Sequence, residues 1–472
     1  MNTRRRFLIT APLGMIGAAI ACRAEPPSAG VSTPPTPGAP PTFATAPESG
    51  PAVSPATFAE AEKLVQVTMS APERDMAAAS WRRSMAPLLE RRTGPRKVAL
   101  EPQIAPATRW NPALSGESGP TRDTFVRSRR DAPLPSSDAD IAFSPVTQLS
   151  RWIEQKALTS ERLTHIYLRR IEQFDRQLRC VITLTRELAL AQAAKADAEI
   201  AAGTYRGPLH GIPFGVKDLL DTAGIATTYG AEPFRNRVPS TDSAVVHRLN
   251  QAGAVLIAKL SLGALALNDI WFGGQTMNPW LIEEGASGSS AGPGAATAAG
   301  LVGFSIGSET GGSIVSPSMR CGVTGLRPTF GRVPRTGAMT LCWSLDKLGP
   351  MTRGVEDAML VVREISGPDA GDVSSVPSRL EFDATTSVAG LRVGYFPAWM
   401  KEDPATDVDR AALETVTKLG MAATEVSLPD WPYDSLQHVL FSEAAAAFED
   451  LTLTGGLQSL KAQVPDAWPN LF

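Results

Sequence analysis

Lys217 ends a segment whose residue types suit acid–base chemistry. The run His210–Asp218 alternates larger apolar side chains with other residues, as a strand with one buried face does, and closes with Lys-Asp. An unperturbed lysine has a pKa of about 10.4 and is only about 0.1% neutral near pH 7.5. Burial at the end of a core strand favours the neutral form and would make Lys217 a base. In this segment alone, a lysine that reaches to solvent remains the alternative.

Two further segments place serines among glycines. Gly285–Gly294 contains the pair Ser289-Ser290, but neither the Gly-Lys-Ser/Thr nor the acidic residue of nucleotide-binding loops follows it. Gly307–Ile314 has two glycines before Ser313. These glycines let successive backbone N–H groups point at one spot, as an oxyanion hole requires. Each segment alone also fits a structural interpretation, as a tight turn or as a loop that leads into a packed helix.

The elements that must position these segments follow from hydrophobic periodicity. A helix capped by Thr159 or Ser160 is predicted from the buried stripe Leu163, Tyr167, Ile171 and Phe174. Strands that alternate with helices indicate an α/β sheet covered on both faces. The predicted strands are 180–185, 212–217 and 254–259, and further helices end at Gly203 and span 244–249.

In their order, these segments resemble the motifs of the amidase signature family. The G-V-K-D, G-G-S-S-G-G-S, D-T-G-G-S-I-R and G-L-K-P-T motifs of that family correspond to Gly215–Asp218, Ser287–Pro293, Glu309–Val315 and Gly325–Thr329. Asn278–Trp280 and Leu348–Thr352 also match, and Ser289 precedes Ser313 by a typical spacing. The resemblance runs from about residue 143 to the end. It implies the family's α/β fold, a large mixed twisted β-sheet with helices on both faces.

The resemblance also implies a Ser-Ser-Lys triad. Ser313 would be the nucleophile, Ser289, which follows a cis peptide bond, would relay protons, and Lys217 would be the neutral base. No cofactor and no metal are expected. The oxyanion would be held by the N–H groups of Thr310, Gly311, Gly312 and Ser313, with Ser290 supporting the network. None of the four histidines stands in a recognisable Ser-His-Asp context, which favours lysine as the base.

Two positions depart from the family pattern. Glu309 replaces the usual Asp, and Val315 replaces the usual Arg of the nucleophile segment. We expect Glu309 to pair with Arg320 instead, so that activity is retained with an altered substrate preference. The predicted substrate pocket includes Thr228, Tyr229, Trp271 and Phe272, which favour an apolar or aryl acyl group unless they belong to the core.

The first 22 residues resemble a twin-arginine export signal. Arg4, Arg5 and Arg6 precede an apolar stretch of 15 residues, 7–21, which is too short to span a membrane. Ala-Ile-Ala before Cys22 suits either ordinary cleavage or a lipobox that makes Cys22 a lipid anchor, and an uncleaved anchor is the third alternative. Residues 26–55 contain ten prolines and predict an extended, disordered tether. An exported, periplasmic or membrane-anchored protein is therefore expected.

The predicted domain order is a signal peptide (1–22), a tether (23–56), a helical or irregular arm (57–140) and an amidase signature domain (141–472). In the arm, Thr57 and Glu60 form a capping-box pattern, and helices are predicted up to about residue 70 and over about 73–91. Family members usually run well past the point where this sequence stops, so a truncated chain is expected.

The net charge and the cysteine spacing exclude some classes of partner and of structure. The net charge of −3 argues against nucleic acid, and the spacing of the four cysteines argues against a metal ribbon or a disulfide scaffold. The cysteines other than Cys22 are predicted to be buried thiols.

Three functions remain. The first is an exported amidase that acts on a small-molecule amide through a Ser313 acyl-enzyme. The second is a glutaminase like the A-type subunit of the glutamyl-tRNA(Gln) or aspartyl-tRNA(Asn) amidotransferases, and the third is a catalytically inactive exported binding lipoprotein. A homodimer is left open.

Overall fold

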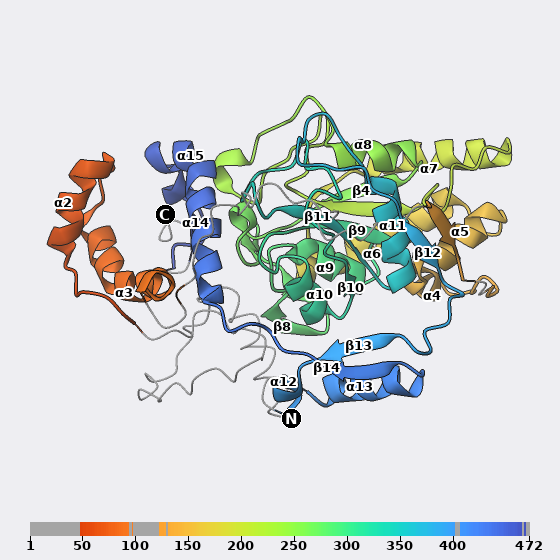
Figure 1. Cartoon of the computed structure of the whole chain (residues 1–472). Helices are drawn as coiled ribbons and strands as arrows, with labels where there is room; N and C mark the ends of the chain where they lie inside the picture. The colour runs from red at the N-terminus through yellow and green to blue at the C-terminus, as the bar shows by residue number, and fades with distance from the viewer. Residues whose placement is uncertain are drawn as a thin grey trace. The chain divides into compact units, whose positions relative to one another are not determined.

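The computed structural model describes residues 48–93, 97, 122–128, 131–401, 406–464 and 467–468. The predicted signal peptide, Cys22 and most of the predicted tether lie outside these residues. The described parts of 1–104, 386–454 and 463–472 form one compact unit, and those of 105–385 and 455–462 form another (Figure 1). Residues 386–454 thus cluster with the N-terminal helices and not with the segments that carry the motifs. The predicted domain boundaries themselves stay predictions.

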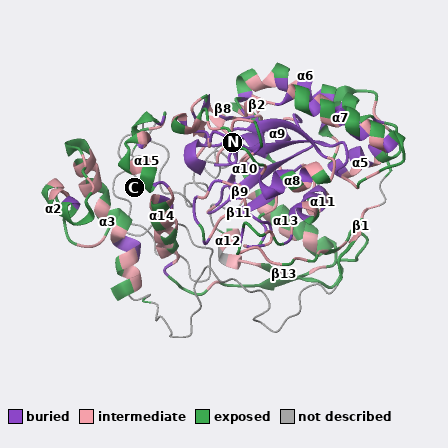
Figure 2. Cartoon of the chain, turned by 90° about the horizontal axis from the view of Figure 1, so that it is seen from above, coloured by how far each residue is buried: buried purple, intermediate pink, exposed green. Residues whose placement is uncertain are grey.

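A six-stranded sheet forms the centre of the second unit, with the strand order β10-β11-β9-β3-β4-β2. The central strand β3 runs parallel to β4 and β9, while β2, β10 and β11 pair antiparallel with their neighbours, so the sheet is mixed as predicted. Every residue of β3, β4, β9 and β11 is buried, as expected for strands covered on both faces (Figure 2). The strands are β2 (Val181–Leu184), β3 (Pro213–Lys217), β4 (Val255–Leu260), β9 (Phe304–Glu309), β10 (Thr324–Gly325) and β11 (Lys347–Thr352).

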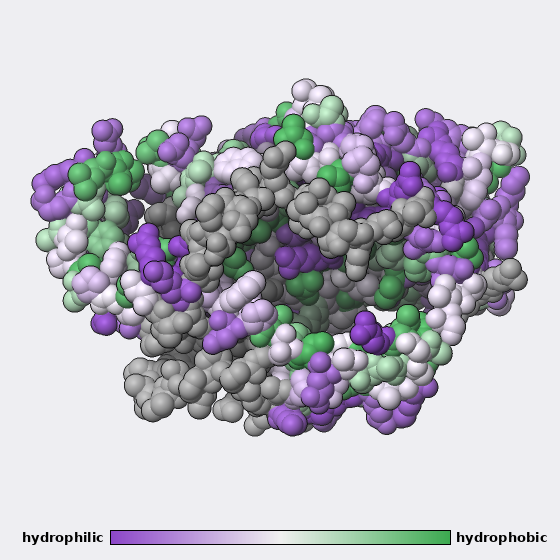
Figure 3. Space-filling model, viewed as in Figure 1, coloured by the Kyte–Doolittle hydropathy of each residue, from purple (hydrophilic) through white to green (hydrophobic). Residues whose placement is uncertain are grey.

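Helices of this unit pack on the sheet through apolar faces. The predicted stripe of α6 is confirmed at Leu163, Tyr167 and Ile171, which are buried, and the Thr159 hydroxyl caps the helix by accepting the Arg162 N–H at 3.1 Å. The surface where α7 lies in Figure 1 is mostly hydrophilic (Figure 3). The helices are α4 (Asp138–Phe143), α5 (Val146–Glu154), α6 (Ser160–Leu178), α7 (Arg186–Ala201), α8 (Ala244–Gln251), α9 (Ala291–Ala298), α10 (Val315–Cys321) and α11 (Val355–Ile365).

Shorter elements complete the unit. β1 and β12 pair in parallel, and β5–β6 and β7–β8 are antiparallel pairs that precede the glycine-serine loop. Their bounds are β1 (Thr124–Val126), β5 (Ile270–Trp271), β6 (Gly274–Gln275), β7 (Met277–Asn278), β8 (Leu281–Gly285), β12 (Glu381–Asp383), η2 (Glu232–Phe234), η3 (Ala264–Ala266) and η5 (Gly456–Ser459). The cysteines of this unit, Cys180, Cys321 and Cys342, are buried thiols that form no disulfide, which confirms the prediction.

The first unit holds six described α-helices and a small parallel sheet. The first helix that the structure describes begins at Pro55, with Ser54 at its N-cap and Thr57 three residues on, so the predicted start at Thr57 was late. The unit comprises α2 (Pro55–Val65), α3 (Ala71–Thr93), β13 (Arg392–Tyr395), α12 (Pro397–Lys401), α13 (Asp407–Lys418), β14 (Ala422–Glu425), η4 (Tyr433–Ser435), α14 (Leu436–Ala447) and α15 (Glu449–Leu453). Among the helices that the structure describes, none has the length and apolarity to cross a bilayer.

Candidate active site

Lys217 lies at the carboxyl end of β3 and has no solvent exposure. The preceding Gly215 permits the close approach of β4, because a Cβ there would lie 2.5 Å from Leu260 Cδ1. The Lys217 ammonium nitrogen Nζ lies within hydrogen-bond distance of three hydroxyls. It lies 2.7 Å from Ser289 Oγ, 3.1 Å from Ser290 Oγ and 2.8 Å from Ser308 Oγ.

This environment changes the acidity of the lysine. Burial lowers the pKa of Lys217 to about 7, and the more distant Glu309 and Asp346 carboxylates raise it in opposition. Among the described residues, no carboxylate forms an ion pair with Lys217. About half of the Lys217 side chains are therefore neutral near pH 7, and a neutral amine surrounded by hydroxyls can accept a proton from one of them.

The loop that carries Ser289 runs from the end of β8 to the start of α9. Its Gly288–Ser289 peptide bond is cis, as the family resemblance implies. A Cβ on Gly288 would lie 1.7 Å from the Asn268 carbonyl oxygen, so only glycine fits there. Ser287 anchors the loop by donating its N–H to Asp269 Oδ2 at 3.1 Å. The loop thereby holds Ser289 against Lys217.

Ser290 links this loop to β9 and to the nucleophile segment. Its hydroxyl donates to the Ser308 carbonyl oxygen at 3.1 Å and accepts the Ser308 N–H at 3.2 Å. Its own N–H donates to the Ser313 carbonyl oxygen at 3.0 Å. The structure thus brings Lys217, Ser289, Ser290 and the backbone of Ser313 into one connected network.

Ser313 stands between β9 and α10 and is 7% exposed. The Gly312 backbone before it has φ of +124°, a conformation that L side chains rarely adopt. The Glu309 carboxylate closes the turn by accepting the N–H groups of Gly312, Ile314 and Val315. The turn is therefore held by backbone hydrogen bonds to a buried acid.

The expected Glu309–Arg320 pair is wrong. Arg320 Nη1 bonds instead to Glu284 Oε2 of β8 at 2.9 Å. The reason is local, because the longer Glu309 side chain folds back onto the N–H groups just after it. Helix α10 meanwhile places Arg320 in reach of β8.

The four predicted oxyanion donors are not equivalent. The Gly312 N–H is already bonded to Glu309. Across residues 131–401, no acceptor is described for the N–H groups of Thr310, Gly311 or Ser313. These three donors belong to the same turn and can stabilise an anionic oxygen beside Ser313.

The predicted pocket residues serve other contacts. Thr228 donates its N–H to Asp218 Oδ2 at 2.8 Å, and Tyr229 packs on Phe234. The Trp271 indole N–H donates to the Arg179 carbonyl oxygen at 3.1 Å, and the Arg235 guanidinium lies 4.4 Å from the Phe272 ring centroid. None of the four lines the cavity that opens beside Ser308, so their assignment to the pocket stays a prediction.

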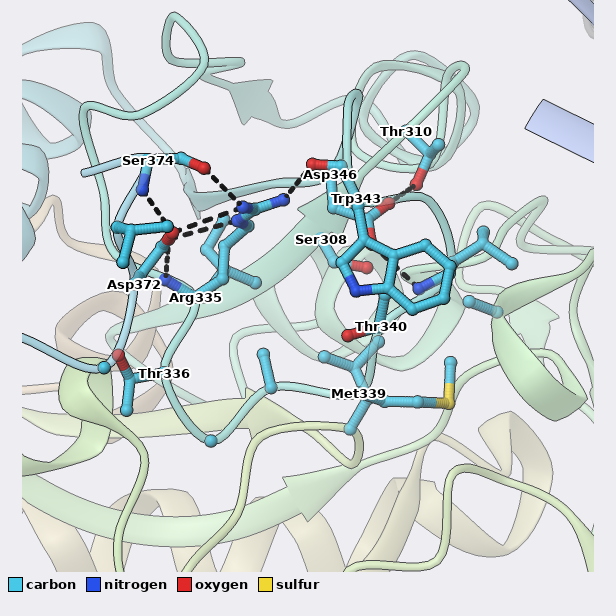
Figure 4. A pocket seen from close by; sticks show the side chains of 18 residues that line it. Ser308, Thr310, Arg335, Thr336, Met339, Thr340, Trp343, Asp346, Asp372 and Ser374 are labelled. Atoms are coloured by element: carbon cyan, nitrogen blue, oxygen red, sulfur yellow. Dashed lines mark hydrogen bonds and ion pairs between the residues drawn. The ribbon is translucent and has the colours of Figure 1, made fainter. Parts of the chain in front are cut away.

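This cavity has a volume of about 410 Å³ (Figure 4). Ser308 and Thr310 form its inner wall, and most of the remaining wall comes from the loop before β11 and from residues 371–374. Sequence reasoning missed both Ser308 and this loop. The only signal was that Ser308 directly precedes Glu309 in a matched motif, and the loop has no periodicity.

A second buried lysine was also missed. Lys259 Nζ of β4 lies 3.0 Å from Asp218 Oδ1, and neither side chain is exposed. The available signal was that Asp218 directly follows one predicted strand and Lys259 ends the next one along the chain. Within the described part of the chain, no group of three or more His, Cys, Asp or Glu is placed to hold a metal ion.

The chain is similar in sequence to curated proteins of known family. The A-type subunit of glutamyl-tRNA(Gln) amidotransferase from Roseiflexus sp. (strain RS-1) is 40% identical over 300 residues, which are 61% of this chain and 61% of that protein. Its counterpart from Heliobacterium modesticaldum is 39% identical over 315 residues, which are 64% of this chain and 63% of that protein. The chain thus matches less than two thirds of the length of these curated relatives.

The chain is also similar to solved structures of amidases. The peptide amidase of Stenotrophomonas maltophilia is 35% identical with a TM-score of 0.61, over 66% of this chain and 68% of that one. An amidase family protein of Bacillus anthracis is 28% identical with a TM-score of 0.61, over 69% of this chain and 68% of that one. The family model described as Amidase matches residues 162–466. The chain therefore belongs to the amidase signature family.

Proposed function

We propose that the chain is a serine amidase that hydrolyses the C–N bond of a carboxylic amide through an acyl-enzyme on Ser313. The observation that carries this proposal is the fully buried Lys217, whose Nζ lies 2.7 Å from Ser289 Oγ. With a pKa of about 7, this lysine is a base at neutral pH that needs no histidine.

The proposed reaction has two halves. Lys217 takes the Ser289 proton while Ser289 takes the Ser313 proton, and Ser313 Oγ attacks the amide carbonyl carbon. The N–H groups of the turn stabilise the oxyanion. The C–N bond then breaks, Ser289 protonates the departing amine, and Lys217 returns its proton to Ser289. Water repeats the attack on the ester and releases the acid, which restores Ser313.

A glutaminase of the amidotransferase type is the second candidate, because curated relatives of up to 40% identity carry that enzyme's name. The arginines before an apolar stretch at residues 7–21 support export instead, since a glutaminase of that type works beside tRNA. We propose an exported location on that basis. Fractionation of the full chain and of an Arg4→Lys/Arg5→Lys variant tests it. Recovery of the full chain in the cytoplasmic fraction would contradict export, and equal export of the two would contradict the twin-arginine route.

A fluorophosphonate probe with mass-spectrometric mapping tests the serine machinery. We expect the adduct on Ser313 alone, lost in Ser313→Ala and retained in the matched control Ser366→Ala, whose hydroxyl only bonds the Val362 carbonyl oxygen. A folded protein that does not label would overturn the amidase proposal. It would leave the third candidate, a binding protein in which Glu309 and Val315 silence the site.

A further inference from the structure

The cavity shares two wall residues, Ser308 and Thr310, with the catalytic network. Ser308 lines it while the Ser308 hydroxyl lies 2.8 Å from Lys217 Nζ. Thr310, the first residue of the oxyanion turn, lines it as well. A group that occupies the cavity therefore lies next to the atoms that the proposed reaction uses. Its volume of about 410 Å³ falls within the usual range of small-molecule pockets.

The only cationic side chain among the lining residues is already paired. Arg335 bonds through Nε and Nη2 to the two Asp372 carboxylate oxygens at 3.1 and 3.2 Å. Nη2 also donates to Ser374 Oγ, and Nη1 donates to the Trp343 carbonyl oxygen at 2.6 Å. Figure 4 shows this guanidinium held between Asp372 and Ser374. It closes one end of the cavity and does not offer a free cation.

The remaining acid of the wall is equally engaged. Asp346 accepts the Thr310 hydroxyl at 2.6 Å and the N–H groups of Leu341 and Cys342 at 2.8 and 2.9 Å. These bonds use both of its carboxylate oxygens. The charged groups among the described lining residues therefore already have hydrogen-bond partners within the protein.

Part of the wall is apolar and aromatic. Trp343 and Met339 both line the cavity (Figure 4), and Trp343 is 47% exposed. Leu219, Leu341 and Ala266 contribute further apolar surface. A half-exposed indole in a wall that also contains a thioether is a surface that gains free energy by covering a flat apolar group.

We propose that this cavity binds an uncharged aryl or branched alkyl group of the amide, so that the enzyme acts on neutral apolar amides and not on glutamine. This inference rests on the proposed function. Glutamine would bring an ammonium and a carboxylate to a wall whose charged groups already have hydrogen-bond partners, and burying unpaired charge is costly. Trp343 is the specificity-determining residue.

The test compares phenylacetamide, acetanilide, propionamide and glutamine as substrates of the full chain. We expect kcat/KM for one of the aryl amides to exceed that for propionamide at least about tenfold, with no glutamine turnover. Preference for phenylacetamide places the acyl group in the cavity, and preference for acetanilide places the amine there. Glutamine or propionamide as the best substrate would overturn the inference.

Variants assign the preference to the cavity. Trp343→Ala should lower the aryl-to-propionamide ratio about tenfold, and Trp343→Phe should retain most of it because the ring remains. The matched control Trp431→Ala, an exposed tryptophan of the other unit, should leave the ratio unchanged. An unchanged ratio in folded Trp343→Ala would refute the assignment.

Direct binding separates this inference from the proposed function. In the Ser313→Ala variant, saturation-transfer NMR should detect binding of phenylacetamide or acetanilide but not of glutamine. The signal should vanish in the double variant Ser313→Ala/Trp343→Ala. If Ser313→Ala shows such binding while the unmutated chain does not label with fluorophosphonate, the cavity inference is supported and the amidase proposal is rejected. Labelling at Ser313 without binding of the aryl amides and without preference for them would support the amidase proposal and reject the cavity inference.

Discussion

Two lysines lie near the ends of neighbouring parallel strands, and both are fully buried. Lys259 of β4 faces a carboxylate, with Nζ 3.0 Å from Asp218 Oδ1, and also donates to the Leu220 carbonyl oxygen and to Thr227 Oγ1. Lys217 of β3 faces only hydroxyls within hydrogen-bond distance. Residue 217 pairs with Leu260, one position beyond Lys259, so the same sheet edge holds both.

The partner of each lysine determines what it can do. Burial lowers the pKa of Lys259 as well, but the adjacent Asp218 carboxylate opposes this shift and favours the ammonium form, and the pair connects two strands. A buried ammonium among hydroxyls is uncompensated, and desolvation then pushes the proton off near neutral pH. Burial alone therefore does not make a lysine a base, and the absence of an adjacent acid is the second requirement.

The largest expected effect comes from removing each lysine in turn. Lys217→Met should lower the rate of fluorophosphonate labelling of Ser313 by about 10²–10⁴-fold, the usual contribution of a general base, while the protein stays folded. Lys259→Met should instead lower the denaturation midpoint. Circular dichroism and labelling rates on both variants check this, and equal loss of labelling at equal stability would erase the distinction between the lysines.

Breaking the ion pair from the other side should cost stability. Asp218→Ala leaves the Lys259 ammonium buried and uncompensated, and we expect a loss of about 3–5 kcal/mol in the free energy of unfolding. Urea titration measures it, with Asp383→Ala on the exposed edge strand β12 as the control. A change of less than about 1 kcal/mol for Asp218→Ala would show that the pair is not structural.

The pH dependence should sharpen the contrast. Because the pKa of Lys217 is lowered to about 7, the neutral base predominates above that pH and is lost below it. Labelling of Ser313 should therefore fall about tenfold from pH 8 to pH 6 and level off above pH 8. A stopped-flow or timed labelling series checks this, and a midpoint near pH 10 would mean that Lys217 titrates like a solvated lysine.

The smallest expected effect concerns Ser308. Ser308→Ala removes one of the three hydroxyls at Lys217 Nζ, which should slow labelling about fivefold, for a hydrogen bond worth about 1 kcal/mol. The pH midpoint should fall as well, because the ammonium form loses a partner. Ser308→Thr keeps the hydroxyl and should restore the rate. A Thr variant as slow as the Ala variant would assign the effect to packing.

Much of the fold was predictable because its elements have strong local signals. The strands found at 181–184, 213–217 and 255–260 agree with the predicted ranges to within one residue at each end. These runs are apolar, and turn residues bound them. The order of the glycine-serine motifs identified the family and the mixed sheet, because such motifs need particular backbone conformations that few sequences provide.

The pairing of side chains was less predictable, because it depends on helix direction and strand register. Arg320 is close to Glu309 in sequence, yet α10 places it against Glu284. The Asp218–Lys259 pair joins residues that are 41 positions apart, and only the β3–β4 register brings them together. The cavity wall around Trp343 comes from a loop without periodicity, where sequence gives no geometric signal.

The reactivity of the three buried cysteines Cys180, Cys321 and Cys342 can measure how often the structure around them opens. Burial raises the pKa of the Cys321 thiol to about 12 and that of Cys180 well above its ordinary value. An alkylating reagent such as iodoacetamide reacts with thiolates, so it should reach these sites only when the surrounding structure opens. Cys180 borders the edge strand β2, Cys321 ends α10 behind the nucleophile turn, and Cys342 belongs to the cavity loop. Peptide-resolved alkylation rates would thus measure local opening at the sheet edge, the nucleophile helix and the substrate cavity separately, without any engineered probe.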